Sequence, residues 1–338
     1  MGLNPLVADG VLAVDAGNSK TDVALVAADG TVLGAARGGG FQPQTVGTGA
    51  AVDGIARIVE EAAAASGLRA QPGEPLVRHV FACLANADLP VEEQQLERAV
   101  HARGWGTGTS VANDTFALLR AGVDEPRGVA VVCGAGINCV GMLPDGRTAR
   151  FPAIGHLSGD WGGGAGLADE ALWWAARAED GRGGATALAA ALPAHFGLTS
   201  MYALIEALHL GRLPASRKHE LTPVLFTTAQ DGDPVARAIV ERQAEEIVVM
   251  ATVALRRLGL LDEATDVVLG GGVLAARHPL LTDSVISLLA ASAPRAVPKI
   301  VTSPPVLGAA LLGLDRTGAA AEAHTRLRAH YAPANSAS

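Results

Sequence analysis

Four aspartates lie where apolar runs of the sequence end or turn, which is where a carboxylate can reach a ligand. Asp15 ends the run VLAVD, Asp22 follows the next turn, Asp114 precedes the segment TFALLRAG, and Asp160 stands before WGGG. Phosphoryl transfer needs one carboxylate that anchors hydrated Mg²⁺ and another that takes the proton of the attacking hydroxyl. A single turn aspartate more often caps a helix or closes an Asx turn, as Asp114 could do. Asp160 has no helix directly behind it to cap, which favours a functional role.

Three glycine-rich turns follow apolar runs, namely DAGNSKT (15–21), CGAGINC (133–139) and LGGGV (269–273). Each alone is a weak signal, because glycine often follows a strand for steric reasons. The first lacks the GxxxxGK frame of a P-loop, and the third lacks the acid about 20 residues on that contacts ribose in dinucleotide-binding folds. Together the three turns predict backbone N–H groups that hold a polyphosphate, with Ser19, Lys20 and Thr21 as further donors.

Aromatic residues near these turns are candidates for a ligand-binding wall. Trp161 stands among glycines in GHLSGDWGGGAG (155–166), so we expect it to line a cleft. Phe41, in the loop GGGFQPQTVG, is a second candidate. Trp173 and Trp174 are neighbours on an expected helix and point about 100° apart, so at least one of them should pack into the core.

Composition narrows the class of protein. The 338 residues exceed the usual size of a single hydrophobic core, and 49% of them are hydrophobic, which predicts a folded protein of two domains. The net charge of −8 argues against nucleic acid and anionic membranes as partners. Without a long apolar run or a signal peptide, we expect a cytoplasmic protein that does not contact membranes. Cys83, Cys133 and Cys139 form no CxxC pair and the nine histidines show no ligand spacing, so we expect neither a disulfide nor a transition-metal site.

Two segments of the chain share one design. Residues 11–37 and 128–151 each contain an apolar run, a glycine turn, a second run, an Asp-Gly turn and a third run. This pattern predicts two three-stranded meanders. Helix-rich sequence follows each of them, so the internal duplication predicts an α/β fold with two domains of common architecture.

Capping residues set the expected helix ends. We expect a helix that stops at Gly67, a helix that begins at Pro90, and a helix that Asp233 caps and that ends near Gly259. A last helix should begin near Pro305. Further strands are expected at 77–85, 109–113, 264–270 and 298–303, with several short helices between 184 and 230.

These motifs, in this order, resemble those of the BadF/BadG/BcrA/BcrD-type ATPases and the N-acetylglucosamine kinases grouped with them, within the superfamily of actin-like ATPases and sugar kinases. DAGNSKTDVAL and CGAGINC look like the two phosphate motifs, VANDTFALLRAG like the segment with the catalytic acid, GHLSGDWGGG like the family's GHxxGDEGS loop, and VVLGGGV like its adenosine motif. The resemblance covers roughly residues 11–315. It implies two ribonuclease-H-like domains around an ATP·Mg²⁺ cleft. Their expected bounds are 1–116 for the N-terminal domain, with a closing helix at 304–325, 117–303 for the nucleotide-binding C-terminal domain, and 326–338 for a disordered tail.

The resemblance also assigns roles by position. Asp114 would be the general base toward a sugar hydroxyl, Asp15 would act through hydrated Mg²⁺, and Asp160 would touch substrate or metal-bound water. The residues implied in ATP binding are Gly17, Asn18, Ser19, Lys20, Thr21, Gly134, Ala135, Gly136, Gly271 and Gly272. Those implied in substrate binding are Asn113, Asn138, Asp160, Trp161 and Gln42.

The implied function is an ATP-dependent kinase of a sugar hydroxyl, with an amino sugar such as N-acetylglucosamine or glucosamine as substrate, in a cytoplasmic homodimer. The chain departs from those kinases in having GAGINC in place of GTGSNC, and Trp161 in place of an acid. Losing one good polar partner shifts discrimination by roughly 1–3 kcal/mol, so the sugar stays open. Two alternatives also stay open. One is an ATPase that drives a partner protein, like the dehydratase activators with their cysteine-held iron–sulfur cluster, and the other is a regulator that binds nucleotide or sugar without turnover.

Overall fold

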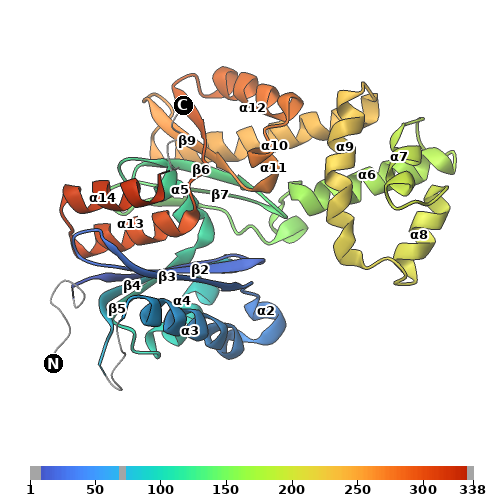
Figure 1. Ribbon diagram of the computed structural model, residues 1–338. Helices are drawn as coiled ribbons and strands as arrows, with labels where there is room; N and C mark the ends of the chain where they lie inside the picture. The colour runs from blue at the N-terminus through green and yellow to red at the C-terminus, as the bar shows by residue number, and fades with distance from the viewer. Residues whose placement is uncertain (1–8, 68–73, 333–338) are drawn as a thin grey trace, which may run out of the picture. The chain divides into compact units, whose positions relative to one another are not determined.

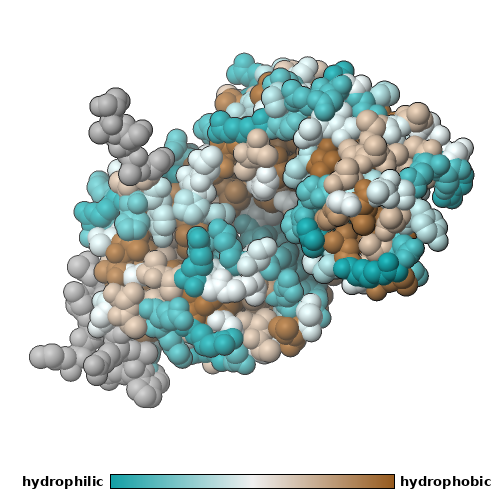
Figure 2. All heavy atoms as spheres, turned by 45° about the vertical axis from the view of Figure 1, so that its right-hand side comes forward, coloured by the Kyte–Doolittle hydropathy of each residue, from teal (hydrophilic) through white to brown (hydrophobic). Residues whose placement is uncertain are grey.

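The computed structural model describes residues 9–67 and 74–332 (Figure 1). Its strands form two five-stranded sheets, which confirms the predicted α/β fold class. The chain forms two compact units: unit 1 comprises Met1–Ala130, Val140–Pro152 and Val301–Ser338, and unit 2 comprises Val131–Cys139 and Ala153–Ile300. Over the described ranges, no helix is long and apolar enough to cross a membrane. Figure 2 shows apolar residues scattered among polar ones on the visible face, as is usual for a folded protein.

The first sheet lies in unit 1 and has the strand order β3-β2-β1-β4-β5. Its first three strands form the predicted antiparallel meander, whereas β4 pairs parallel to β1 and β5 parallel to β4. The strands are β1 Val11–Ala16, β2 Lys20–Val26, β3 Val32–Gly39, β4 Val77–Leu84 and β5 Gly106–Asn113. The helices of this unit are α2 Pro43–Val46, α3 Thr48–Ala65, α4 Pro90–His101, α5 Asp114–Gly122, α13 Pro305–Thr317 and α14 Ala321–Tyr331.

The two faces of the first sheet carry different residues, because alternate side chains of a strand point to opposite sides. Leu12 and Val14 belong to one buried cluster, together with residues of α3 and α4. Val11 and Ala13 belong to another, together with residues of α13 and α14. Asp15 continues the alternation of Val11 and Ala13, so it stands on the face that α13 covers.

The second sheet has the order β10-β9-β6-β7-β8. Its strands are β6 Gly128–Cys133, β7 Ile137–Met142, β8 Thr148–Arg150, β9 Thr265–Gly270 and β10 Ala296–Ile300. The remaining helices are η1 Gly155–Ser158, α6 Gly163–Glu179, α7 Leu188–His195, α8 Met201–His209, η2 Ala215–Glu220, α9 Leu221–Gln230, α10 Pro234–Leu258, α11 Gly272–Ala275 and α12 Pro279–Ser292. The short helices predicted between 184 and 230 are α7, α8, η2 and α9.

The two copies of the predicted duplication agree in their strand order and in the hydrogen bonds of their turns. Read from its other edge, the second sheet has the order β8-β7-β6-β9-β10, which matches β3-β2-β1-β4-β5 strand for strand. Two hydrogen bonds of 2.9–3.0 Å close each Asp-Gly turn. In the first, Ala27 N–H donates to Thr31 O and Gly30 N–H donates to Ala27 O, and in the second, Leu143 N–H donates to Arg147 O and Gly146 N–H donates to Leu143 O. Asp29 and Asp145 each accept the N–H two residues on at 3.0 Å, and Gly30 and Gly146 have φ values of 85° and 89°.

The helix ends follow the predicted capping residues. Asp233 Oδ1 accepts the N–H of Ala236 at 2.8 Å, and Pro234 is the first residue of α10. Gly259 ends that helix in the left-handed conformation with φ 73°. Helix α3 ends at Ala65, just before Gly67 with φ 75°. These ends were predictable because each cap depends on only a few neighbouring residues.

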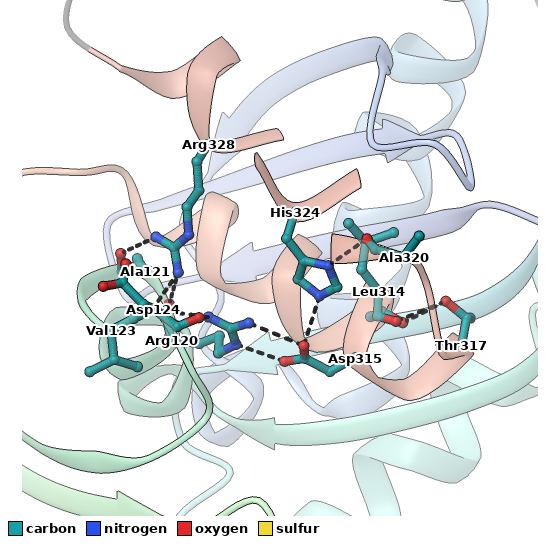
Figure 3. Close-up of polar contacts among 11 residues, drawn as sticks. Arg120, Ala121, Val123, Asp124, Leu314, Asp315, Thr317, Ala320, His324 and Arg328 are labelled. Atoms are coloured by element: carbon teal, nitrogen blue, oxygen red, sulfur yellow. Dashed lines mark hydrogen bonds and ion pairs between the residues drawn. The ribbon is translucent and has the colours of Figure 1, made fainter. Parts of the chain in front are cut away.

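A polar cluster ties α13 and α14 to the end of α5 (Figure 3). Arg120 of α5 is 2% exposed and donates to both carboxylate oxygens of Asp315 in α13, from Nε at 2.7 Å and from Nη2 at 3.1 Å. His324 of α14 contacts the same carboxylate at 2.8 Å, and Arg328 donates to backbone carbonyls at the end of α5. The cluster fixes the helix whose first residue is Asp114.

The expected disordered tail at 326–338 is partly wrong. Helix α14 continues to Tyr331, because Leu327 is fully buried and Arg326 donates to the backbone carbonyl of Asp29 at 3.0 Å. Residues 333–338 lie outside the described part of the chain.

Candidate active site

Asp15 and Asp22 form a carboxylate pair near the end of β1. They face each other in the antiparallel register of β1 and β2, and each is 6% exposed. Arg37 donates to both oxygens of Asp22, at 2.6 and 3.1 Å, and Lys20 Nζ lies 3.5 Å from Asp22 Oδ2. The two cations thus balance Asp22, whereas Asp15 has no such ion pair in the part of the chain that the structure describes.

Asp114 is the first residue of α5, as predicted, and it adds a third acid to this region. Burial, with the nearby charges of Asp114 and Asp22, raises the pKa of Asp15 to about 8, although Lys20 and Arg37 oppose this effect. Burial also raises the pKa of Asp114 to about 6, against the helix N–H groups at its own position and the next. Two acids of one site therefore differ in their affinity for a proton, which is common where acid–base chemistry occurs.

The excess of negative charge suits a divalent cation. Within residues 9–67 and 74–332, no three His, Cys, Asp or Glu side chains gather as a ready-made metal site. Mg²⁺ does not need one, because it keeps several waters and takes one or two protein carboxylates together with substrate phosphates. Asp15 is a buried carboxylate whose charge is poorly compensated, so it fits the predicted Mg²⁺ role.

The first glycine turn presents an exposed rim beside this acid. Gly17 donates its N–H to Lys20 O at 2.9 Å, and Asn18, Ser19 and Lys20 are exposed. Thr21 differs from its neighbours, because it is 1% exposed. Three of the four predicted polar donors of this turn can therefore reach a ligand without rearrangement.

Asn86, which the sequence analysis missed, orients the same turn. Its Nδ2 donates to Asn18 Oδ1 at 3.0 Å and to Phe41 O at 3.2 Å, and its φ is 63°. Gln42 Nε2 donates to Asn18 O at 3.3 Å, so this side chain is engaged with the turn. Phe41 is 2% exposed and packs in the core of unit 1, but it also borders a hollow of about 280 Å³ beside Thr21 and Gly40, so its place in a cleft wall stays a prediction.

Asn113 is the N-cap of helix α5, which begins at Asp114. Its Oδ1 accepts the N–H of Thr115 at 2.9 Å, its Nδ2 donates to Asp88 Oδ1 at 2.8 Å, and it is 3% exposed. The structure thus explains Asn113 by its support of α5. Any contact with substrate would be additional to that role.

The second glycine turn lies in unit 2 and is enclosed by other glycines. A Cβ on Gly163 would stand 2.5 Å from Gly136 C, and a Cβ on Gly271 would stand 2.4 Å from Cys133 O. Gly164 N–H donates to Gly134 O at 2.7 Å. The start of α6 and the third glycine turn therefore both touch the second turn, main chain against main chain, which only glycine permits.

The rim of the second turn resembles that of the first in exposure. Ala135 and Gly136 are exposed and Gly134 is partly exposed, so their main chain is accessible to a ligand. Asn138 Oδ1 accepts the N–H of Cys139 at 2.7 Å. Gly272 begins helix α11 directly after Gly271 and has open space around its Cα.

Asp160 closes its own loop. Its Oδ2 accepts from Gly155 N at 3.0 Å and from Ser158 Oγ at 2.5 Å, and its N–H donates to Gly155 O at 3.2 Å. Asp160 therefore has a local structural role that the sequence analysis did not consider, because it holds the helix η1 that precedes it. One carboxylate oxygen carries these bonds, which leaves Oδ1 for a ligand.

Trp161 is held by one partner from α6 and one from α10. Its Nε1 donates to Glu170 Oε1 at 3.3 Å, and the guanidinium carbon of Arg242 lies 4.1 Å from its ring centroid. The indole is 8% exposed yet borders two hollows, so its ring is fixed and still reachable. Neither partner is predictable from the sequence, because Glu170, nine residues after Trp161, and Arg242, in another helix, are polar and helix periodicity marks only apolar faces.

Gln243 supports the same loop from α10. It is fully buried, its Oε1 accepts the N–H of Gly163 at 2.8 Å, and a Cβ on Gly162 would lie 2.1 Å from that oxygen. The expectation that Trp173 or Trp174 packs in the core is wrong. Trp173 is 50% exposed, Trp174 is partly exposed, and their rings meet edge to face at 4.8 Å on the surface of α6.

The predicted site residues thus form two groups. Unit 1 brings together Asp15, Asp22, Asp114, Asn113 and the turn Gly17–Thr21. Unit 2 brings together the turn Gly134–Gly136, the loop with Asp160 and Trp161, and the turn Gly271–Gly272.

Known proteins resemble this chain in sequence and in fold. The N-acetylmuramic acid/N-acetylglucosamine kinase of Clostridium acetobutylicum is 26% identical over 266 residues, which are 78% of this chain and 85% of that protein. The N-acetyl-D-glucosamine kinase of Dictyostelium discoideum is 29% identical over 209 residues, 61% of this chain and 65% of that protein. A Chromobacterium violaceum structure with the provisional name N-acetylglucosamine kinase superposes with a TM-score of 0.69 at 24% identity, over 90% of this chain and 99% of that one. That likeness concerns the fold alone.

The family profile settles the relationship. The profile of the BadF/BadG/BcrA/BcrD ATPase family matches residues 12–313, from β1 to most of α13. The chain belongs to the BadF/BadG/BcrA/BcrD ATPase family.

Proposed function

We propose that this protein is an ATP-dependent kinase that transfers the γ-phosphate of ATP to a hydroxyl of an amino sugar. The curated relatives carry the names of N-acetylglucosamine kinases, and the family is one of ATPases. The observation that carries the proposal is Asp114, a base with a pKa of about 6 at the start of a fixed helix. A group with this pKa is ionised at neutral pH and still able to accept a proton.

The carboxylates of unit 1 would divide the work. Asp114 would accept the proton of the sugar hydroxyl as that oxygen attacks the γ-phosphorus. Asp15 would hold Mg²⁺ through its hydration shell, and the bound cation supplies neutralisation of phosphate charge. Asn18, Ser19 and Lys20 would donate to phosphate oxygens from the exposed rim of their turn.

The turns of unit 2 would bind the nucleotide mainly through the main chain. Gly134, Ala135 and Gly136 offer accessible backbone, and Gly271 and Gly272 form the turn before α11. Backbone donors do not depend on side-chain hydroxyls, so Ala135 and Ile137 in place of Thr and Ser still leave a phosphate cradle.

The sugar would contact Asp160 Oδ1, Asn138 and the Trp161 loop in unit 2, and Asn113 and Gln42 in unit 1. We further propose that the protein is a cytoplasmic homodimer with a small-molecule substrate, as the family resemblance implies. The dehydratase-activator alternative is disfavoured. Cys133 and Cys139 are fully buried, and burial raises the pKa of Cys133 to about 12 and that of Cys139 as well, so neither is a ready thiolate for a cluster.

The test is ADP release with a panel of amino sugars, N-acetylated sugars and plain hexoses. Wild-type protein should release ADP with an amino sugar in the presence of Mg²⁺. Asp114→Asn should lower turnover by about 10²–10⁴ with nucleotide binding retained. Turnover like the wild type in this variant would remove Asp114 from the base role, and absence of ADP release with every sugar would refute the kinase proposal.

A further inference from the structure

A hollow of about 640 Å³ lies in unit 2 beside the Trp161 loop. Its lining includes Ala135, Gly136 and Asp160, which belong to the proposed site, and also Trp173 and Trp174, which do not. A second hollow of about 340 Å³ shares Trp161, Glu170, Trp174 and Arg242 with the first. The indoles therefore extend the binding surface away from the turn that is proposed to hold phosphate.

The aromatic wall is held in place before any ligand arrives. Trp161 is fixed by its bond to Glu170 and by the Arg242 guanidinium over its ring. Trp173 and Trp174 meet edge to face at 84°, and Arg177 lies 4.5 Å over the Trp173 ring. Rigid aromatic side chains provide contact area at a small cost in conformational entropy.

The charges around the hollow exclude some ligands. Asp160, Asp169 and Glu170 line it, against the cations Arg242 and, when protonated, His156. Away from the main chain of Ala135 and Gly136, the three carboxylates would repel a polyphosphate, and an acyl chain would offer no donor to their remaining acceptor oxygens. A neutral ligand with many hydroxyls and apolar C–H faces satisfies both sets, because carboxylates accept from hydroxyls and indoles pack on C–H faces.

The size of the hollow exceeds what one sugar ring fills, since pockets of about 300–1,000 Å³ hold drug-sized ligands. We propose that the hollow binds the second ring of a disaccharide, so that the preferred substrate is an amino sugar carrying a further sugar unit. This inference rests on the proposed kinase function and specifies its substrate class. The second ring adds contacts that persist throughout the reaction, so its main effect is on KM.

The experiment compares N-acetylglucosamine with its β-1,4-linked disaccharide in the ADP-release assay. Wild-type kcat/KM should be at least about tenfold higher for the disaccharide, chiefly through a lower KM. Trp174→Ala should reduce the ratio of the two kcat/KM values to about one. Trp105→Phe is the matched control, because Trp105 packs against the core of unit 1, and it should keep the wild-type ratio.

A titration of tryptophan fluorescence without ATP separates the two proposals. The disaccharide should bind at least about tenfold more tightly than the monosaccharide to wild type, and equally to Trp174→Ala. Turnover of the monosaccharide with a ratio of one or less in wild type would overturn the disaccharide site and leave the kinase standing. Tight disaccharide binding without any ADP release would refute the kinase and keep the sugar site.

Discussion

The first and second glycine turns stand at the same place in duplicated meanders, yet they are built for different work. Each turn has three residues, Gly17–Ser19 after β1 and Gly134–Gly136 after β6. The second-last residue of the first strand is Asp15 in one copy and Val132 in the other. The third residue of the next strand is Asp22 in one copy and Cys139 in the other.

The difference shows that one scaffold can deliver either charge or main chain. The first turn sits above a buried carboxylate pair, whereas the second has apolar side chains below it and is enclosed by Gly163, Gly164 and Gly271. The first copy therefore suits a metal and proton chemistry. The second suits recognition by backbone groups alone.

The largest expected effect is a pH dependence of stability that comes from Asp15, below the first glycine turn. The folded protein keeps a proton on Asp15 up to about pH 8, whereas the unfolded chain loses it near pH 3.8, so stability should fall as the pH rises between these values. At about 1.36 kcal/mol per pKa unit the loss is on the order of 5 kcal/mol. Denaturant unfolding from pH 4 to 9 measures most of it, and Mg²⁺ should recover part of the loss at the upper end.

Asp15→Asn is the control for this pH dependence. The variant should lose most of the slope and keep a smaller part between pH 4 and 6, because Asp114 also has a raised pKa. An equal slope in wild type and Asp15→Asn would contradict the assignment of the effect to Asp15.

A carboxylate placed in the second meander tests whether that position requires an apolar side chain. Cys139→Asp introduces an unpaired charge at a fully buried position that corresponds to Asp22, and it should destabilise the protein by about 3–5 kcal/mol. Chemical denaturation measures the change. Cys139→Val, which keeps an apolar side chain, should cost less than about 1.5 kcal/mol, and similar losses in both variants would show that shape rather than charge decides this position.

The enclosure of the second turn can be tested with adjacent glycines. Gly271→Ala puts a Cβ 2.4 Å from Cys133 O at a φ of 86°, so a loss of about 2–4 kcal/mol and of nucleotide binding is expected. Gly272→Ala meets nothing within 4 Å and is the matched control, with stability near that of wild type. Thermal unfolding with and without ATP distinguishes them, and equal tolerance of both would refute the close packing.

The smallest effect is expected at the rim. Gly134→Ala meets nothing within 4 Å, so stability should change by less than about 0.5 kcal/mol. The KM for ATP should nevertheless rise several-fold, because the added methyl group narrows the approach to the main chain. An unchanged KM would mean that ATP does not touch this rim.

The sequence predicted the local features of the fold well. The strands of both meanders, the caps at Asp233 and Gly259, and the position of Asp114 at a strand-to-helix junction each depend on a few adjacent residues. Asp15 was placed at a strand end by the same kind of signal.

Contacts between distant segments could not be predicted from the sequence. The Arg242 partner of Trp161, the Arg120–Asp315 pair and the support of Gly163 by Gln243 each join residues far apart in the chain. The bonds of Asp160 are local, but its partners Gly155 and Ser158 precede it, whereas the usual capping signal of an aspartate lies in the residues that follow it.

The place of α13 has a consequence for synthesis of the protein. β1 begins at residue 11, but the helix that covers one face of its sheet begins at residue 305. Gly308 and Gly313 let this helix approach so closely that added Cβ atoms would stand 1.7 Å from Ala117 O and 2.2 Å from Val11 Cγ1. On the ribosome the N-terminal sheet must therefore wait, with an apolar face uncovered, until residues 305–317 of α13 have been made. Such long-range closure is slow and prone to aggregation, so the demand for chaperones should be greatest in the period before α13 emerges.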